Sequence, residues 1–431
     1  MRQPRQKLYI GFFDLINAFI SILFGIGFEK GNYVSKFSRK VEDYWKRKKC
    51  FPLSSARICL YYYLKSLNLS KDSEVLLTPV QIPDYINIIL ELGLKPVFIE
   101  MDQQTQSIDL EDLKKKISTN SKVVLATYLT GILPKIDEIA EICKKNKIFL
   151  IEDISQSYGS HYKNIKAGLF GDAAIASMSP AKIISSIGGG FLILDNNENI
   201  KFIENIIEKD LSKPPKSTLL KICIFQIKVK ILTSKLIFDF FTYYIFKLLS
   251  SISRKKFDEI HTPNFKYIHK DKTFYDNPTI IRKLPKEFFI YFVDLQAKIA
   301  IKTFDNNLNK GLSNRQLIAK IFYESLNDKP KKFIPNLVSN YTNSCFWHFP
   351  IVLDREITKS FQKYLLKKGY DVVGYGLRLC NTELVLENTN KNLPVSNHIH
   401  KNTLFLPMHD DLKENEIKRI SSDINNFFDK N

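Results

Sequence analysis

Short apolar runs alternate with segments of helical periodicity along the first half of the chain. The runs are short and partly β-branched, and they lie at 74–77, 95–100, 123–128, 148–151, 173–178 and 191–194. Runs of this kind predict buried strands. Apolar residues at helical spacing predict helices between them, at 58–67, 84–92 and 136–146. Strands that alternate with helices predict an α/β domain built on a mostly parallel sheet with right-handed crossovers.

Polar residues follow two of these strands directly. Asp153 and Gln156 come after the run at 148–151, Ser177 stands near the end of the run at 173–178, and Lys182 is on the loop that follows it. Ligands of open α/β sheets bind outside the carboxyl ends of the strands. We therefore expect these four side chains to converge on one ligand. The alternatives are a solvated lysine and a carboxylate that caps a helix.

A possible anion site precedes the helix predicted at 58–67. Ser55, Ala56 and Arg57 stand at its start, where a serine caps the helix and the exposed N–H groups attract anions. The guanidinium of Arg57 would pair well with a phosphate. An ordinary helix cap is the alternative reading of the same three residues.

Several of these segments occur together in one known family. Residues 152–159 (EDISQSYG), 168–172 (GLFGD) and 177–182 (SMSPAK), followed by the glycines at 188–190, closely resemble the signature of the DegT/DnrJ/EryC1/StrS sugar aminotransferases. The resemblance covers about residues 50–200 and 285–430. It implies the type I fold of enzymes that use pyridoxal 5′-phosphate (PLP), with a large domain on a mostly parallel sheet and a smaller α+β C-terminal domain.

The resemblance also implies roles for the residues at the strand ends. Lys182 would bind PLP covalently and move a proton during the reaction, and Asp153 would pair with the pyridine nitrogen. Gln156 would hydrogen-bond the ring face or its phenolic oxygen, and Ser177 the phosphate. The turn of Ser55, Ala56 and Arg57 would hold the same phosphate.

Three readings of function follow from this resemblance. The first is transfer of an amino group, from glutamate, to a nucleotide-linked keto sugar in the biosynthesis of cell-surface polysaccharide or lipopolysaccharide. The second is a PLP-dependent sugar dehydratase; known dehydratases of this group replace the lysine with histidine, so Lys182 favours transamination. The third is an inactive binding protein, because residues 78–83 lack the aromatic residue that stacks on the ring and Phe289 to Tyr291 replace an expected Asn-X-Arg element. The nearest aromatic residue to that loop is Tyr85.

Composition limits the partners and the compartment. The chain has 431 residues, 44% of them hydrophobic, and a formal charge of +19, which favours anionic partners. It carries no nucleic-acid-binding signature, so we expect no nucleic acid partner. Its six cysteines are far apart, which predicts buried thiols in a reducing cytoplasm, and no spacing predicts a metal site. The family implies a homodimer.

Two apolar segments rich in basic residues complete the predicted organisation. Residues 9–28 suit a helix that lies on a membrane surface or on the protein better than one that crosses a bilayer, since Asp14 lies inside them. Residues 219–252 predict an amphipathic helical segment, either packed on the body or touching an anionic membrane. A polar connector from Arg254 to Pro285 follows. We predict an N-terminal segment at 1–49, the PLP domain at 50–205, an insertion with its connector at 206–284, and the small domain at 285–431.

Overall fold

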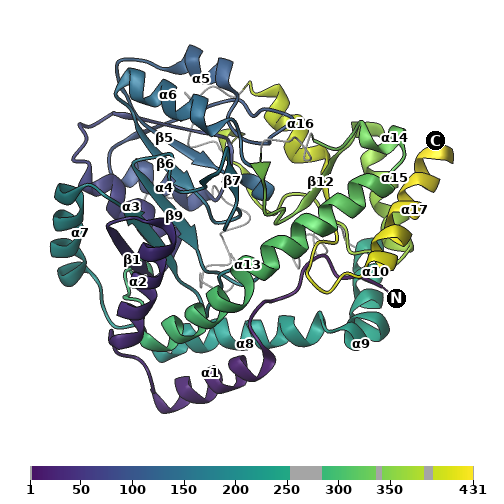
Figure 1. Cartoon of the computed structure of the whole chain (residues 1–431), viewed down its shortest axis with the longest axis horizontal. Helices are drawn as coiled ribbons and strands as arrows, with labels where there is room; N and C mark the ends of the chain where they lie inside the picture. The colour runs from purple at the N-terminus through teal and green to yellow at the C-terminus, as the bar shows by residue number, and fades with distance from the viewer. Residues whose placement is uncertain (1, 253–283, 336–341, 383–391, 431) are drawn as a thin grey trace.

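The computed structural model describes residues 2–252, 284–335, 342–382 and 392–430. The connector predicted from Arg254 to Pro285 lies outside the described residues, apart from its last two positions. The chain builds a large α/β domain, a smaller C-terminal domain and a group of helices that lies against both (Figure 1).

A seven-stranded sheet forms the centre of the large domain. Its order is β1-β10-β9-β6-β5-β2-β4, where the strands are β1 (Lys49–Leu53), β2 (Glu74–Leu77), β4 (Lys95–Phe98), β5 (Ser121–Thr127), β6 (Phe149–Asp153), β9 (Ala173–Ser177) and β10 (Gly190–Leu194). The strands from β9 to β4 are parallel to their neighbours, whereas β10 and β1 pair antiparallel. The mostly parallel sheet is thus confirmed.

Helices cover both faces of this sheet, which explains why its strands are apolar throughout rather than alternating. One face packs against α2 (Asn32–Trp45), α6 (Ile136–Asn146) and the first half of α13 (Asp294–Ser325). The other face packs against α3 (Ala56–Ser66), α4 (Pro83–Glu91) and α7 (Asn197–Asp210). The helices predicted between the strands are present, and α5 (Leu110–Lys116) is added to them.

The small domain has its own core. An antiparallel pair, β12 (Phe349–Val352) and β14 (Thr403–Leu406), packs with α15 (Arg355–Lys367), α16 (Pro394–Asn402) and α17 (Glu414–Lys430). The short elements are β3 (Val80–Gln81), β7 (His161–Tyr162), β8 (Ile165–Lys166), β11 (Thr342–Asn343), β13 (Arg378–Leu379) and α14 (Asp328–Lys331), with 3-10 turns at Leu129–Gly131, Lys286–Phe288 and Cys380–Thr382. Helix α13 links the domains because Phe304 packs in the large core and Phe322 in the small one.

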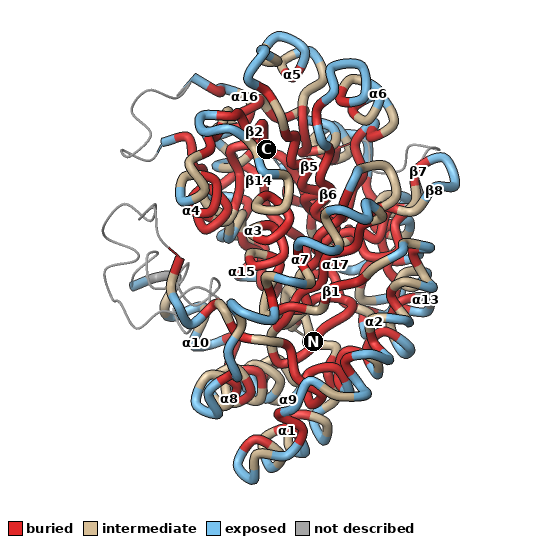
Figure 2. Tube along the Cα trace, turned by 90° about the vertical axis from the view of Figure 1, so that its left-hand side faces the viewer, coloured by how far each residue is buried: buried red, intermediate tan, exposed pale blue. Residues whose placement is uncertain are grey.

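The two apolar segments are helical and pack on the protein through one face. Helix α1 (Phe12–Phe24) lies against α8 (Lys216–Leu232), with Leu15, Ile22 and Leu219 buried between them. Helix α8 continues into α9 (Lys235–Ile237), a π-helical turn (Phe238–Thr242) and α10 (Tyr243–Ile252). The outer sides of these helices are largely exposed (Figure 2). None of the helices in the described part of the chain has both the length and the apolar character needed to cross a membrane.

Candidate active site

The carboxyl ends of two neighbouring strands bring the predicted residues to one edge of the sheet. Asp153 is the last residue of β6 and Ser177 the last residue of β9, and these two strands pair in parallel. Lys182 follows on the loop between β9 and β10. Backbone hydrogen bonds close this loop, from Met178 to Gly189 and from Ser186 to Met178, at 2.9 Å each. The predicted convergence of Asp153, Ser177 and Lys182 at this edge is therefore present.

Lys182 is held in an aromatic and largely buried environment. Its side-chain nitrogen lies 3.7 Å from the centre of the Trp347 ring, and the residue is 8% exposed. Burial lowers the pKa of Lys182 from 10.5 to about 8, although the nearby Asp153 carboxylate opposes this shift. A lowered pKa leaves more of the amine neutral near physiological pH, and the neutral form is the nucleophile.

Trp347 comes from the small domain and was not predicted from the sequence. Its indole N–H donates to the backbone oxygen of Ala181 at 3.0 Å, directly before Lys182. The buried Arg315 in turn donates to the backbone oxygens of Phe346 and Trp347, at 3.1 and 3.2 Å. The small domain thus supplies one wall of the site, and no local sequence signal identifies that wall.

Asp153 accepts two hydrogen bonds inside the large domain. The backbone N–H of Ser155 donates to one carboxylate oxygen at 2.9 Å, and the hydroxyl of the buried Tyr85 donates to the other at 2.8 Å. Tyr85, which the sequence left without a role, therefore orients Asp153. It contacts the carboxylate from the first turn of α4.

The adjacent Glu152 has a separate, structural role. Because side chains alternate along a strand, Glu152 points to the opposite face from Asp153. It accepts hydrogen bonds from the Tyr128 hydroxyl and from the backbone of Gly168 and Gly171, each at 2.7 Å. Burial raises the pKa of Glu152. This carboxyl group therefore holds the turn at 168–171 in place and lies away from Lys182.

Gln156 keeps its amide nitrogen available for a ligand, whereas the Ser177 hydroxyl is hydrogen-bonded to Ser179. The side-chain oxygen of Gln156 accepts from the backbone N–H of Thr130 at 2.9 Å, and no described residue is recorded as a partner of its amide nitrogen. The Ser177 hydroxyl donates to that of Ser179 at 3.1 Å, while the Tyr158 hydroxyl donates to the backbone oxygen of Ser177 at 2.7 Å.

The start of α3 lies beside Ser177 because of a glycine. Gly190 pairs with Ser177 across β10 and β9, and Ser55 forms a bridge with Gly189. A Cβ on Gly190 would come within 2.4 Å of the backbone nitrogen of Ala56. Only a glycine allows this close approach of the helix start to the sheet edge. The Ser55 hydroxyl accepts from Ile58 N at 3.4 Å as a helix cap.

These contacts fit PLP at this edge of the sheet. A serine-capped helix start beside Ser177 suits a phosphate, a carboxylate of fixed orientation suits a protonated pyridine nitrogen, and a buried amine suits covalent attachment. Lys182, Asp153, Gln156, Ser177, Ser55 and Ala56 are the residues that would hold the cofactor. Within the described residues, no group of three or more His, Cys, Asp or Glu side chains is arranged to hold a metal ion.

In the folded chain, Arg57 pairs with a carboxylate of the protein, whereas the sequence predicted that it pairs with a phosphate. Its guanidinium pairs with the buried carboxylate of Asp84 at 2.6 Å and lies over the ring of Phe288, 4.3 Å from the ring centre. Asp84 therefore already neutralises the charge expected to pair with a phosphate. A phosphate contact by Arg57 stays a prediction, and it requires the guanidinium to serve two anions.

Comparison with known proteins supports the resemblance. The model of the DegT/DnrJ/EryC1/StrS aminotransferase family matches residues 14–223 and 291–425. The match begins within 9–28, a segment that the sequence analysis placed outside the family core. That expectation was wrong, because α1 packs on α8 as part of the matched region. Residues 224–290 remain outside the match, and the insertion predicted at 206–284 stays a prediction.

Individual relatives match parts of the chain. The GDP-perosamine synthase of Escherichia coli O157:H7 is 28% identical over 167 residues, which are 39% of this chain and 46% of that protein. The dTDP-4-dehydro-2,6-dideoxy-D-glucose 3-dehydratase of Saccharopolyspora spinosa is 31% identical over 143 residues, 33% of this chain and 31% of that enzyme. The matched part of the chain thus spans about half the length of the first of these relatives, and less of the second.

Solved structures share the fold over the whole chain. PseC of Helicobacter pylori, an aminotransferase involved in the biosynthesis of pseudoaminic acid, superimposes with a TM-score of 0.71 at 17% identity, covering 100% of both chains. The family model covers well over half of the chain, in both domains, and it includes the strands and loops that place Lys182 and Asp153. The chain belongs to the DegT/DnrJ/EryC1/StrS aminotransferase family.

Proposed function

We propose that this protein is a PLP-dependent aminotransferase that moves an amino group, from glutamate, to the keto group of a nucleotide-linked sugar. The observation that carries the proposal is the position of Lys182, buried against the Trp347 ring with its pKa lowered to about 8 by burial. A buried amine of this kind is suited to a covalent role, and a solvated surface lysine would keep its ordinary pKa.

Each residue of the site would have a distinct role in binding the cofactor or moving a proton. When bound, PLP withdraws electrons from the substrate carbon that loses its proton. Asp153, oriented by Tyr85 and by Ser155 N, would hold the proton on the pyridine nitrogen. The Lys182 amine would move a proton at the substrate carbon. Ser177, Ser55 and Ala56 would bind the phosphate, and the Gln156 amide would contact the ring or its phenolic oxygen.

The alternative activities differ from this proposal in their products. A sugar dehydratase is supported by the Saccharopolyspora relative, but Lys182 stands where known dehydratases are expected to carry histidine. An inactive binding protein would explain Ile82 in the loop that should supply a stacking aromatic residue.

The test is an assay with purified protein, PLP, glutamate and a panel of nucleotide-linked keto sugars. The expected result is an aminated sugar by mass spectrometry, with stoichiometric formation of 2-oxoglutarate. A dehydrated sugar without 2-oxoglutarate would establish the dehydratase instead. A protein that binds PLP and a nucleotide sugar but converts neither would establish the binding protein.

We also propose a homodimer, as the family implies, in which the partner chain borders the site. The measurement is light scattering on the protein loaded with PLP, combined with activity across a dilution series. We expect a mass of two chains and a specific activity that falls where the dimer dissociates. A fully active monomer would contradict the proposal.

The proposed reaction belongs to the synthesis of cell-surface polysaccharide or lipopolysaccharide, in the cytoplasm and at the inner face of the membrane. The six cysteines support a reducing compartment, since all of them are buried free thiols. Oxidising compartments favour disulfides instead.

A further inference from the structure

The helical run from α9 to α10 packs on the small domain through one face. Phe238 and Tyr243 are buried there in a cluster with Leu366 and Val373, and the Tyr243 hydroxyl donates to the backbone oxygen of Leu366 at 2.7 Å. Arg2 further fixes the run through an ion pair with Asp239 at 3.1 Å. The orientation of the run about its own axis is therefore set by the fold.

The opposite face of the same run is apolar and exposed. We call this face the apolar stripe; its residues follow one another at helical spacing and are Leu236, Phe240, Phe241, Tyr244, Ile245, Leu248 and Ile252. Phe240 and Phe241 are 65% and 66% exposed. Scattered exposed apolar residues are common, but a continuous stripe marks a surface that meets a partner.

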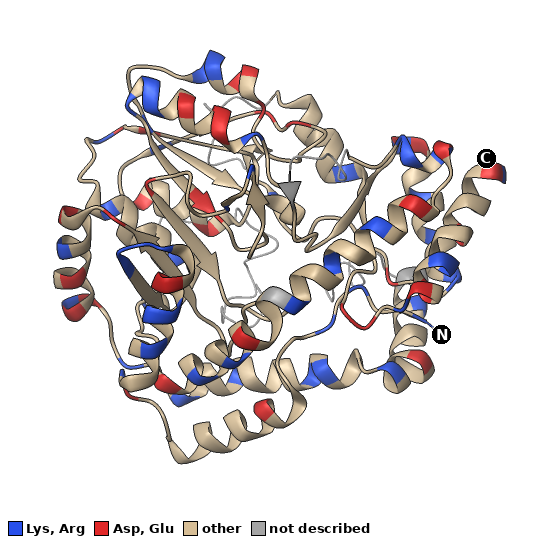
Figure 3. Cartoon of the chain, viewed as in Figure 1, with Lys and Arg blue, Asp and Glu red and all other residues tan. Residues whose placement is uncertain are grey.

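The charge around the stripe selects among partners. Residues 211–252 contain seven lysines and one acidic residue, Asp239, and Arg2 already neutralises that residue. Lysine positions are coloured blue along α8 and α9 in Figure 3. Two copies of this face would repel each other, and a nucleic acid would leave the aliphatic side chains uncovered. A membrane surface with anionic lipids complements both the apolar stripe and the lysines.

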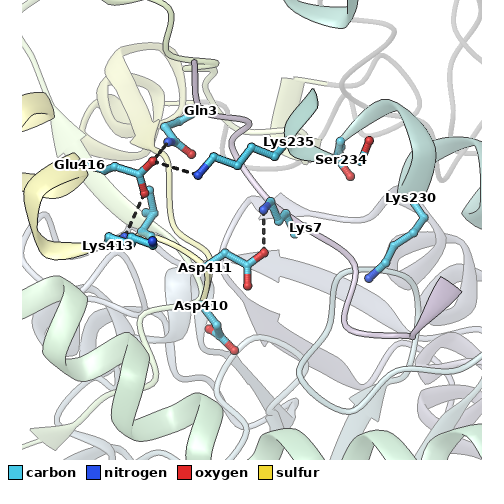
Figure 4. Close-up of a pocket in the computed structure, with 11 residues that line it drawn as sticks. Gln3, Lys7, Lys230, Ser234, Lys235, Asp410, Asp411, Lys413 and Glu416 are labelled. Carbon is cyan, nitrogen blue, oxygen red and sulfur yellow. Dashed lines mark hydrogen bonds and ion pairs between the residues drawn. The ribbon is translucent and has the colours of Figure 1, made fainter. Parts of the chain in front are cut away.

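A lysine-lined pocket lies directly beside the start of α9. It has a volume of about 700 Å³, and Lys7, Lys230, Lys235 and Lys413 contribute to its wall (Figure 4). Its three acidic residues are engaged. Asp411 pairs with Lys7 at 2.6 Å, Glu416 with Lys235 at 3.8 Å, and Asp410 with Arg315 at 3.4 Å.

Two ammonium groups of this pocket have no carboxylate partner among the described residues. Lys230 donates to the backbone oxygen of Leu8 at 2.7 Å, and no ion pair of the Lys413 side chain is recorded. The pocket therefore has cationic groups left over for an added anion. Its position next to Leu236 places such an anion at the edge of the apolar stripe, as a lipid headgroup would require.

We propose that the apolar stripe docks on an anionic lipid surface, with its aromatic and aliphatic side chains among the acyl chains and with lipid phosphates at the lysine-lined pocket. The stripe lies in residues 224–290, which the family model does not match. The proposed docking surface therefore lies outside the part of the chain that the family model matches. It does not depend on the proposed transamination, and its test uses no activity.

The experiment is flotation of the full-length protein with vesicles of phosphatidylcholine alone or with added phosphatidylglycerol, at low and high salt. The intact protein is expected to float with the anionic vesicles, less so at high salt because salt screens the lysines. The double variant Phe240→Ser/Phe241→Ser is expected to lose binding to the anionic vesicles and to stay in the soluble fraction with either kind of vesicle. The double variant Lys230→Gln/Lys413→Gln is expected to lose the preference for phosphatidylglycerol, by about fivefold for each lysine.

Two controls keep the result interpretable. Leu317 on α13 is also exposed, at 56%, so Leu317→Ser should float like the intact protein. Circular dichroism should show that all variants remain folded. Intact protein that stays in the soluble fraction under every condition would overturn the proposal, as would Phe240→Ser/Phe241→Ser that floats normally. The apolar stripe would instead belong to a contact with a second copy of the chain if the intact protein bound no vesicles and formed a dimer by light scattering. In that case Phe240→Ser/Phe241→Ser would be the only variant that dissociates the dimer.

Discussion

Lys182→Ala is expected to abolish covalent binding of PLP and to remove transamination activity. Among the described residues, only Lys182 has its side-chain nitrogen over the Trp347 ring, where burial lowers its pKa, so the described part of the chain offers no substitute for this amine. Removing a positioned base lowers the reaction rate by about 10²–10⁴-fold. Removing the covalent attachment of PLP lowers the rate further. The measurements are the visible absorbance of the bound cofactor, its retention in denaturant after borohydride reduction, and turnover.

A matched control is available on the nearby hairpin. Lys163 is exposed and pairs with Asp137 at 2.7 Å, so Lys163→Ala should keep both PLP binding and activity. The lowered pKa of Lys182 adds a pH test, because only the neutral amine attacks an aldehyde. The rate at which the apoprotein takes up PLP should rise about tenfold per pH unit up to about pH 8 and level off above that pH. Wild-type activity in Lys182→Ala would exclude this lysine as the catalytic residue.

Asp153→Asn is expected to keep PLP binding and to lose about 10²–10⁴-fold in turnover. The amide oxygen can still accept from the N–H of Ser155, and the amide nitrogen can donate to the Tyr85 hydroxyl oxygen, which lies 2.8 Å from the carboxylate, so the local fold should persist. An amide carries no negative charge, however, and it cannot hold the proton on the pyridine nitrogen. The change should therefore appear in turnover and in the absorbance of the bound cofactor, but only weakly in cofactor affinity.

Tyr85→Phe separates the charge of Asp153 from its orientation. This variant removes one hydrogen bond and leaves the carboxylate, so its loss of turnover should be much smaller than that of Asp153→Asn. Thermal unfolding of both variants checks that neither effect reflects misfolding. Equal turnover in Asp153→Asn and the intact protein would show that Asp153 only accepts the hydrogen bonds of Ser155 and Tyr85 and has no role in the reaction.

Local patterns along the chain were sufficient for the large domain. The strands of the sheet are buried on both faces, so each appears as a short apolar run, and the helices between them show a helical period of apolar residues. The order of motifs from Glu152 to Gly190 identified the family and indicated that Asp153, Ser177 and Lys182 meet at one edge. This inference holds because parallel strands place their carboxyl ends together.

Other features depend on residues that are distant in the sequence. Trp347 reaches Lys182 from the small domain, Tyr85 reaches Asp153 from α4, and Asp84 pairs with Arg57. No local periodicity encodes such contacts, because each arises where separate elements pack. The sequence therefore predicted a phosphate contact for Arg57 without indicating the carboxylate that pairs with it in the folded chain.

For the two apolar segments, too, some properties follow from the sequence and others only from the tertiary structure. Sequence by itself determined that residues 9–28 and 219–252 are helical, apolar and flanked by basic residues, since these are properties of composition and spacing. Only the tertiary structure decided which face of each helix is buried. Leu15 and Ile22 pack on α8, and Phe238 and Tyr243 pack on the small domain, whereas Phe240 and Phe241 remain exposed. The physical reason is that an apolar helix can bury any of its faces, and the shape of the surface beneath it selects one.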